Sequence, residues 1–434
     1  MRRPLALALA LGSVTVLRAQ DAPRHPVRVA LVGATVIDGT GGAPLPDATV
    51  LVEGERIQAV GRRRDVPIPP GARSIDMTGK WVLPGFIDLH THLTLPQPDG
   101  WGADNSEATR ALRALHYMDL YLRSGITAVR DVASMPEAFQ ALMRGQREGS
   151  VTNAVRLFPV GRAITTKGSG APHPGLFRQV TGPWEFRLAV RESYNAGFRH
   201  IKLIPPFTPE EIAAAIDEAK ILGMRVTTHS AWPGPTSMAR IAAEAGTQCF
   251  EHVGYMTDDL LDLIVAKGIH LVPTIAVLRE FYRPGTESYE LVRRAGWTSS
   301  DHEEVFKKAR KRGIVMGIGT DGIGRFSQRF PDRFPYIGQA PQWYFVELKY
   351  FVELGASPME AIVAATKNGA LILGEESRLG TLAPGKLADL QVIRSSPLES
   401  LDALGNPELV MVGGTLHTFS GADGGTQARS EGAR

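Results

Sequence analysis

The chain has 434 residues, of which 43% are hydrophobic and 21% charged, so its composition is that of a globular protein long enough to bury a large core. One large α/β domain with a smaller companion and three small domains are both compatible with this length. The only cysteine, Cys249, excludes an internal disulfide.

The first residues predict export. Met1 to Pro4 include two arginines, and the apolar run that follows, Leu5 to Leu17, is too short to span a bilayer. With Ala19 as a small residue where cleavage is expected, residues 1–19 are predicted to be a signal peptide; a retained anchor is the alternative. Cleavage of the signal peptide would remove three arginines and no acidic residue, which lowers the number of basic residues from 48 to 45, equal to the 45 acidic residues. The mature chain is then formally neutral, and we expect neither a nucleic-acid partner nor stable membrane insertion.

Short strands are predicted at both ends of the remaining chain, because apolar and polar residues alternate there between glycine-containing turns. These segments are Val27–Ile37, Ala48–Gly61, Leu387–Ile393 and Leu409–Val412. We expect the two ends to pair into one composite β-sandwich domain, residues 20–82 and 376–420. The tail, residues 421–434, is rich in glycine, serine and alanine and is expected to be disordered.

Between those ends, apolar runs rich in β-forming residues alternate with amphipathic helical patterns. The runs are Val82–Leu89, Ile126–Val132, Val155–Gly161, His200–Ile204, Met224–Thr228, Thr247–Glu251, Ile269–Thr274 and Ile314–Gly319. Helices are predicted over Pro209–Leu222, Ser237–Ala245 and Asp258–Lys267. Parallel strands buried on both faces are typically continuous apolar runs, so eight of them predict a (β/α)8 TIM barrel over residues 83–375.

Residues able to bind a metal stand at the ends of five of those runs. Successive side chains of a strand alternate between faces, so His90 and His92 point the same way and can bind one ion together. The carboxyl ends of barrel strands meet at one face, which predicts a metal site built from distant parts of the chain. The candidates are His90, His92, Lys202, His229, His252 and Asp321.

Lys202 is an unusual candidate because an ammonium group has no lone pair to donate. If burial lowers its pKa enough, the amine reacts with carbon dioxide, and the two carbamate oxygens can bridge a pair of metal ions. A lysine paired with an acid near the site is the alternative.

Seven motifs in the chain together resemble the amidohydrolase superfamily, and within it the branch of prolidase-like dipeptidases and relatives of imidazolonepropionase. They are Pro84–His92, Gly125–Asp131, Ile201–Leu203, Thr228–Ser230, Glu251–Val253, Gly319–Asp321 and Leu382–Leu390. The resemblance implies that His90 and His92 bind the more buried metal and that His229 and His252 bind the second. It also implies that carbamylated Lys202 bridges the two ions, and that Asp321 ligates the first and handles protons. Relatives often assemble, so a homo-oligomer is expected.

This ligand set fits hydrolytic chemistry. Two divalent ions lower the pKa of a bridging water and deliver hydroxide near neutral pH, while one of them polarises a scissile carbonyl. Asp321, facing that water, can accept its proton and pass it to a leaving amine. Imidazole and carboxylate ligands suit zinc first, with manganese, cobalt or iron as alternatives.

Four residues near the expected site are candidates for substrate binding. His173 lies in a loop where relatives often carry a Gly-Gly-His segment, and it is expected to reach the substrate or its carbonyl oxygen. Arg325, in a basic and aromatic loop, can clamp a substrate carboxylate. Tyr255 and Arg130 are further candidates. For His173 a loop histidine without such a role is the alternative, and for the loop that contains Arg325 a solvated surface loop is.

The predicted function is that of an exported binuclear amidohydrolase, which cleaves an amide bond in a dipeptide or an N-acyl amino acid with a free carboxylate. Hydrolysis of a cyclic amide, a lactone or a phosphoester on the same site is the alternative. A metal-free binding or scaffold barrel is a different class of protein, and the complete ligand set argues against it.

Overall fold

The computed structural model describes residues 27–95, 106–169, 175–230, 236–281, 299–323 and 341–419. The predicted signal peptide and the predicted tail lie outside the described residues, as do the substrate-binding candidates His173 and Arg325. None of the described helices combines the length and the hydropathy that a bilayer crossing requires.

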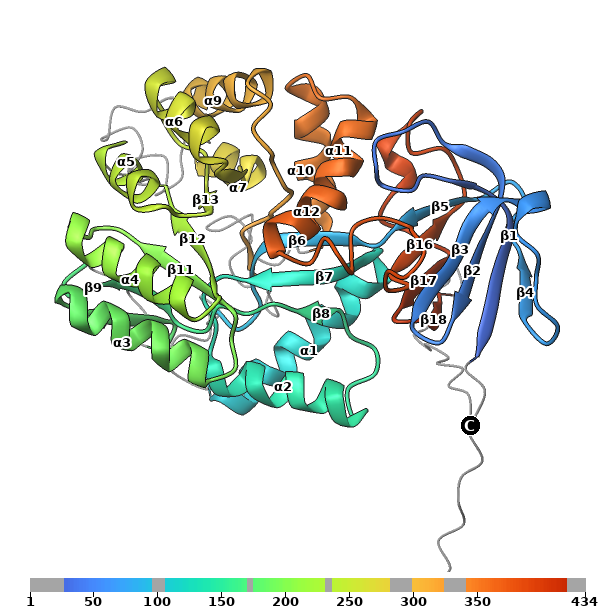
Figure 1. Ribbon diagram of the computed structural model, residues 1–434, viewed down its shortest axis with the longest axis horizontal. Helices are drawn as coiled ribbons and strands as arrows, with labels where there is room; N and C mark the ends of the chain where they lie inside the picture. The colour runs from blue at the N-terminus through green and yellow to red at the C-terminus, as the bar shows by residue number, and fades with distance from the viewer. Residues whose placement is uncertain are drawn as a thin grey trace, which may run out of the picture.

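Strands from both ends of the chain lie in one eight-stranded sheet at one side of the molecule (Figure 1). Its members are β1 (Arg28–Val36), β2 (Leu45–Glu53), β3 (Arg56–Arg62), β4 (Arg73–Asp76), β5 (Trp81–Pro84), β16 (Leu390–Ile393), β17 (Leu409–Val412) and β18 (Thr415–Thr418). Their order is β18-β17-β16-β5-β1-β2-β3, with β4 beside β1. Two short 3-10 helices, η1 (Arg63–Asp65) and η3 (Leu401–Ala403), accompany the sheet.

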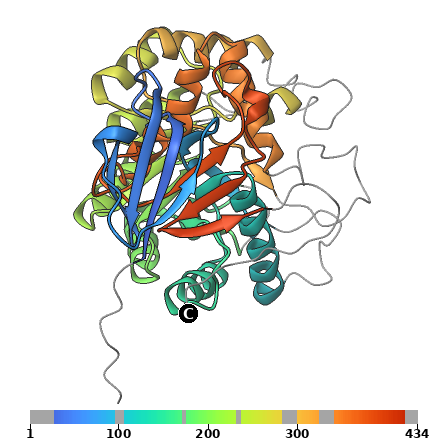
Figure 2. The ribbon, with the colours of Figure 1, turned by 90° about the vertical axis from the view of Figure 1, so that its right-hand side faces the viewer.

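The two ends of the chain meet where β16 pairs antiparallel with β5, with Leu390 opposite Pro84. Figure 2 looks onto this sheet, where the blue N-terminal strands lie beside the red C-terminal ones. Because β16 hydrogen-bonds directly to β5, strands from the two ends of the chain form one hydrogen-bonded ladder. The apolar face of this sheet packs Val50, Val82 and Met411, among others, into a core of its own.

The central strands are all parallel and form two ladders, β15-β6-β7-β8 and β10-β9-β11-β12-β13-β14. They are β6 (Phe86–His92), β7 (Ile126–Asp131), β8 (Arg156–Leu157), β9 (Ala163–Thr166), β10 (Phe177–Val180), β11 (His200–Ile204), β12 (Arg225–His229), β13 (Cys249–Glu251), β14 (His270–Val272) and β15 (Gly322–Ile323). With helices packed outside them, these strands make a TIM-barrel-like α/β fold (Figure 1).

The segment predicted as an eighth strand, Ile314–Gly319, is not a regular strand. It forms one bridge, Met316 to Leu271, in which Leu271 N donates to Val315 O and Gly317 N donates to Leu271 O, both at 3.0 Å. On its other side, Leu89 N donates to Ile318 O at 2.9 Å. Glycine weakens a strand, and positions 317 and 319 of this segment are both glycine. The segment still lies between β14 and β6, so it carries the residue that follows it, Asp321, toward the histidines of β6.

Helices alternate with the central strands. They are α1 (Glu107–Arg123), α2 (Pro136–Glu148), α3 (Gly182–Asn195), α4 (Pro209–Ile221), α5 (Thr236–Ala245), α6 (Asp258–Lys267), α7 (Ile275–Phe281), α9 (Ser299–Lys311), α10 (Gln342–Glu353), α11 (Pro358–Ala365) and α12 (Lys367–Leu373). The three helices predicted from the sequence, now α4, α5 and α6, are confirmed to within one residue at each end. The local sequence explains where α4 begins, because Thr208 and Glu211 form a capping box at its N-terminus and Pro209 lies in its first turn.

Candidate metal centre

His90, His92 and Asp321 form a cluster in which the available ligand atoms all lie within 4.8 Å of one another. Both histidines lie at the end of β6, and their rings are 5.2 Å apart between centroids, so they do project to the same side. Asp321 Oδ1 lies 3.0 Å from His92 Nε2 and 3.3 Å from His90 Nε2. Two imidazole nitrogens and a carboxylate oxygen converging in this way are a donor set suited to zinc and related ions.

His252 and His229 extend this cluster. The His252 ring lies 4.5 Å from the His90 ring and 4.5 Å from the His229 ring, so imidazoles from β6, the end of β13 and the end of β12 are contiguous. His252 Nδ1 shares a hydrogen bond of 2.8 Å with Thr274 Oγ1, which leaves Nε2 as the nitrogen available to an ion. Burial, together with the neighbouring imidazole of His229, lowers the pKa of His252 well below its ordinary value, so this ring is neutral and can donate a lone pair.

Backbone strain is concentrated at this cluster. Four non-glycine residues with positive φ occur among the described residues, and three of them, His252 (φ 60°), Thr274 (φ 50°) and Asp321 (φ 53°), lie here. Such conformations cost energy and persist where the surrounding structure enforces them, which is typical of functional sites. Their position at strand ends turns the side chains of His252 and Asp321 toward the histidines of β6.

Asp88 fixes the turn that carries Asp321. Its Oδ1 accepts hydrogen bonds from the backbone N–H groups of His90 (3.1 Å) and Thr320 (3.2 Å), and its Oδ2 accepts one from Thr320 Oγ1 (2.8 Å). Asp321 N also donates to the His90 carbonyl at 2.9 Å. The carboxylate of Asp88 therefore joins β6 to the segment that precedes β15, and holds the third ligand against the first two.

Lys202, on β11, is 2% exposed, and its Nζ has no hydrogen-bond partner among the described residues. Burial lowers its pKa to about 8, although the carboxylates of Glu251 and Asp321 act in the opposite direction. A buried amine without a hydrogen bond is costly, and a carbamate bound to metal ions would satisfy it. The donor set of this site therefore fits the divalent ions that the sequence predicts.

Two of the substrate-binding candidates lie within the described residues. Tyr255, in the loop between β13 and α6, is 48% exposed and accessible to a ligand. Arg130 was expected to contact substrate. This prediction is wrong, because its side chain is 2% exposed and its guanidinium group donates hydrogen bonds to other residues of the protein. Nη2 donates to Glu251 and Nε donates to the Leu89 carbonyl at 2.7 Å.

Glu251 itself was not singled out from the sequence, although it lies in the Glu251–Val253 motif. Its carboxylate contacts His90 Nδ1 at 2.7 Å. The only signal that the sequence offered was an acidic residue at the end of an apolar run, where an unpaired charge would not be tolerated.

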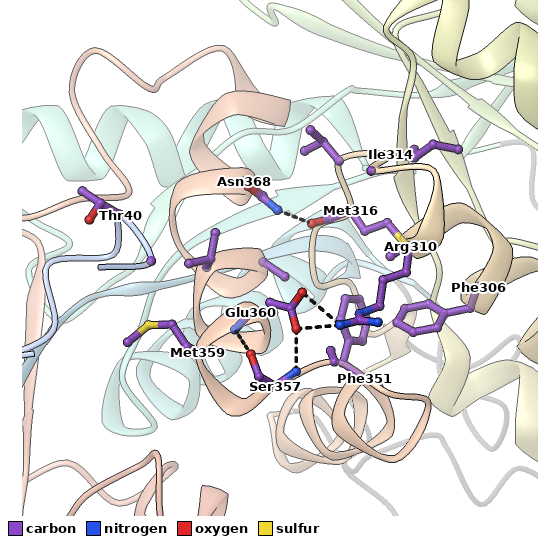
Figure 3. A pocket seen from close by; sticks show the side chains of 16 residues that line it. Thr40, Phe306, Arg310, Ile314, Met316, Phe351, Ser357, Met359, Glu360 and Asn368 are labelled. Atoms are coloured by element: carbon purple, nitrogen blue, oxygen red, sulfur yellow. Dashed lines mark hydrogen bonds and ion pairs between the residues drawn. The ribbon is translucent and has the colours of Figure 1, made fainter. Parts of the chain in front are cut away.

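A cavity of about 510 Å³ lies elsewhere in the molecule and does not include any of these ligands (Figure 3). It is lined by Thr40 and Gly41 from the loop after β1 and by residues from α9 to α12. Two of its polar side chains already have partners: Arg310 Nη2 pairs with Glu360, and Asn368 donates to the Met316 carbonyl at 2.9 Å. The chemistry of the molecule is therefore assigned to the histidine cluster.

A TIM-barrel-like fold with imidazoles, a carboxylate and a buried lysine gathered at one site fits the class of metal-dependent hydrolases. The model of the family described as "Amidohydrolase family" matches residues 81–417. The chain belongs to this amidohydrolase family and is a hydrolase acting on C–N bonds.

Three relatives illustrate the similarity. Ochratoxinase from Aspergillus niger is 26% identical over 430 residues, covering 88% of this chain and 85% of that protein. Imidazolonepropionase from Symbiobacterium thermophilum is 26% identical over 427 residues, covering 86% and 92%. The crystal structure of a Xaa-Pro dipeptidase with methionine bound in its active site has a TM-score of 0.78 and 26% identity, and covers 90% of this chain and 100% of that one.

Proposed function

We propose that this chain is an exported amidohydrolase that holds two divalent ions, zinc first among them, and cleaves an amide bond in a dipeptide or an N-acyl amino acid. The observation that carries the proposal is the convergence of four imidazoles and Asp321 close to a buried lysine amine that has no hydrogen bond among the described residues. Export through residues 1–19 and assembly into a homo-oligomer stay predictions.

The ligands divide into two groups. His90, His92 and Asp321 would hold one ion and His229 and His252 the other, with a carbamate on Lys202 between them. Once bound, the ions supply a Lewis acid for the substrate carbonyl and a water of lowered pKa. Carbamate formation needs the neutral amine, and a pKa of about 8 gives Lys202 a far larger neutral fraction at pH 7 than an exposed lysine has.

Asp321 is the residue placed to move a proton. Burial raises its pKa, but the imidazoles of His90 and His92 more than offset this and hold the pKa well below its ordinary value. The carboxylate is therefore ionised near neutral pH and can accept the proton of the attacking water. Returning that proton to the leaving nitrogen completes the cleavage of the C–N bond.

The substrate class rests on the relatives and on the accessible loop. The similar Xaa-Pro dipeptidase has methionine, an amino acid with a free carboxylate, bound in its active site. Tyr255 is exposed three residues after His252, where its hydroxyl can donate a hydrogen bond to such a carboxylate. Similarity to imidazolonepropionase over 86% of this chain favours hydrolysis of a cyclic amide as the second candidate.

A library assay tests the proposal. Zinc-loaded protein is incubated with dipeptides, N-acyl amino acids, cyclic amides and lactones, and released products are identified by mass spectrometry. We expect amino acids to be released from at least one dipeptide or acyl amino acid, and Asp321→Asn protein to release them far more slowly. Turnover of cyclic amides alone would support the second candidate, and turnover of no C–N substrate would contradict both.

A further inference from the structure

Arg130 and Glu251 form a buried ion pair next to the metal ligands. Their side chains are 2% and 0% exposed, and Nη2 of Arg130 donates to Oε1 of Glu251. Nε of the same guanidinium donates to the carbonyl of Leu89 at 2.7 Å. Since Arg130 belongs to β7, Glu251 to β13 and Leu89 to β6, one side chain joins three strands of the central fold.

Glu251 in turn contacts a ligand directly. Its Oε2 lies 2.7 Å from His90 Nδ1, and its Oε1 also accepts a hydrogen bond from Thr227 Oγ1 on β12. The His90 ring thereby has one nitrogen committed to Glu251, and its other nitrogen, Nε2, faces Asp321. A carboxylate that binds one imidazole nitrogen fixes the orientation and the tautomer of the ring, and so aims the second nitrogen at an ion.

The backbone brings this carboxylate into the site. In a regular strand Glu251 and His252 would project to opposite faces. The positive φ of His252 ends β13 at Glu251, so that both side chains reach His90, one through its carboxylate and the other through its ring. The ion pair is thus placed in direct contact with the ligand His90.

An isolated buried ion pair contributes little net stability, because the cost of desolvating two charges offsets their attraction. Removing one partner is nevertheless costly, since the other charge is left uncompensated. Glu251 would lose its paired guanidinium without Arg130, and its hydrogen bonds with Thr227, His90 and Cys249 would not replace that charge. Net stabilisation of the fold therefore does not account for this ion pair, whereas its location beside the ligand His90 can.

We propose that Glu251 and Arg130 are positioning residues of the metal centre, an assignment that rests on the proposed metal-dependent function. Glu251 orients His90 for the ion that His90 binds. Arg130 neutralises Glu251 and, through the Leu89 carbonyl, holds β6 at a fixed distance from β13. Neither residue touches the substrate.

The test measures zinc affinity, which does not depend on turnover. Metal-free protein is titrated with zinc in competition with a chromophoric chelator, and folding is checked by circular dichroism. We expect Glu251→Gln to weaken the tighter zinc site by about 10- to 100-fold, the range found for residues that support metal-binding histidines. Thr227→Val, which removes only a hydroxyl, should weaken it less, and Thr227→Ser should restore the wild-type value.

Asp389→Asn is the matched control. Asp389 forms a two-point ion pair with Arg156 at 2.6 and 2.9 Å, also between an arginine at a central strand and a buried carboxylate, but neither residue contacts a ligand. This variant is expected to lose stability and to keep wild-type zinc affinity.

The outcomes separate the two proposals. A wild-type chain that binds no zinc overturns the proposed function, and the positioning role with it. Wild-type zinc affinity in both Glu251→Gln and Thr227→Val overturns the positioning role alone. Should Glu251→Gln fail to fold, the comparison of Thr227→Val with Thr227→Ser still decides, because equal affinity of these two variants contradicts the proposal.

Discussion

Two glycines of the segment between β14 and β6 allow a matched test of how packing supports the metal centre. A Cβ atom added at Gly319 would lie 2.4 Å from Val272 Cγ1 and 2.8 Å from His90 Cβ, the first side-chain atom of a ligand. A Cβ added at Gly317 would lie 2.3 Å from Leu89 Cδ1 and 2.9 Å from Ile372 Cδ1, the ends of two flexible side chains. The two alanine substitutions therefore differ in what has to move.

We expect Gly319→Ala to destabilise the fold by about 1–3 kcal/mol, the usual cost of overpacking a core. Because it displaces His90, it should also weaken zinc binding. Each 1.4 kcal/mol lost from the free energy of zinc binding corresponds to about a tenfold lower affinity. Gly317→Ala should cost less stability and leave zinc affinity unchanged, since the tips of Leu89 and Ile372 can rotate away.

Urea denaturation of the metal-free proteins and chelator-competition titration of zinc measure the two quantities separately. The reasoning is refuted if both variants bind zinc as wild type does, or if Gly317→Ala loses as much affinity as Gly319→Ala.

Three further predictions follow from the site and its surroundings. Lys202→Met should leave one zinc ion per folded chain where the wild type binds two, as measured by elemental mass spectrometry; two ions in the variant would contradict a bridging role. Asp321→Asn should lower kcat by about 10²- to 10⁴-fold, the usual contribution of a proton-transferring residue, and near-normal turnover would exclude that role. Burial raises the pKa of Glu347 to about 8 from 4.5, so the folded state holds a proton that the unfolded state has lost. The contribution of Glu347 to stability should therefore fall as pH rises from about 5 to 8, so the stability of wild type relative to Glu347→Gln, measured by urea denaturation at both pH values, should decrease over this range. An equal pH dependence of stability in both proteins would show that Glu347 does not titrate in this range.

The parts of the site that follow a simple periodicity could be predicted from the sequence. His90 and His92 lie two apart at the end of an apolar run, so strand alternation alone places them together. Lys202, His229 and Asp321 follow from the rule that the carboxyl ends of parallel strands share one face.

The location of Glu251 in the site could not be predicted in the same way. Strand alternation places its side chain on the face opposite to that of His252, and the residue with the positive φ, His252, is not a glycine that would indicate such a turn. The prediction for Arg130 was wrong for a related reason: a charged residue near a strand end suggests an exposed group unless its partner is known.

The irregular segment 314–319 has an apolar, strand-like sequence, but glycines at 317 and 319 remove the side chains that a strand would pack. Sequence periodicity predicts the strands at both ends of the chain but not which strands become neighbours, so the antiparallel pairing of β16 with β5 could not be specified in advance.

The pairing of β5 with β16 also sets the order in which the molecule can be completed. Some three hundred residues separate Trp81 from its partner Ile393, so a nascent chain emerging amino-terminus first exposes the unpaired edge of β5 until the last segment is made. Contacts between such distant residues form slowly, and an open edge is a template for aggregation. A chain cut before Leu390 keeps every proposed metal ligand and still loses the strand that seals this edge, so premature termination there should yield insoluble protein rather than a smaller enzyme.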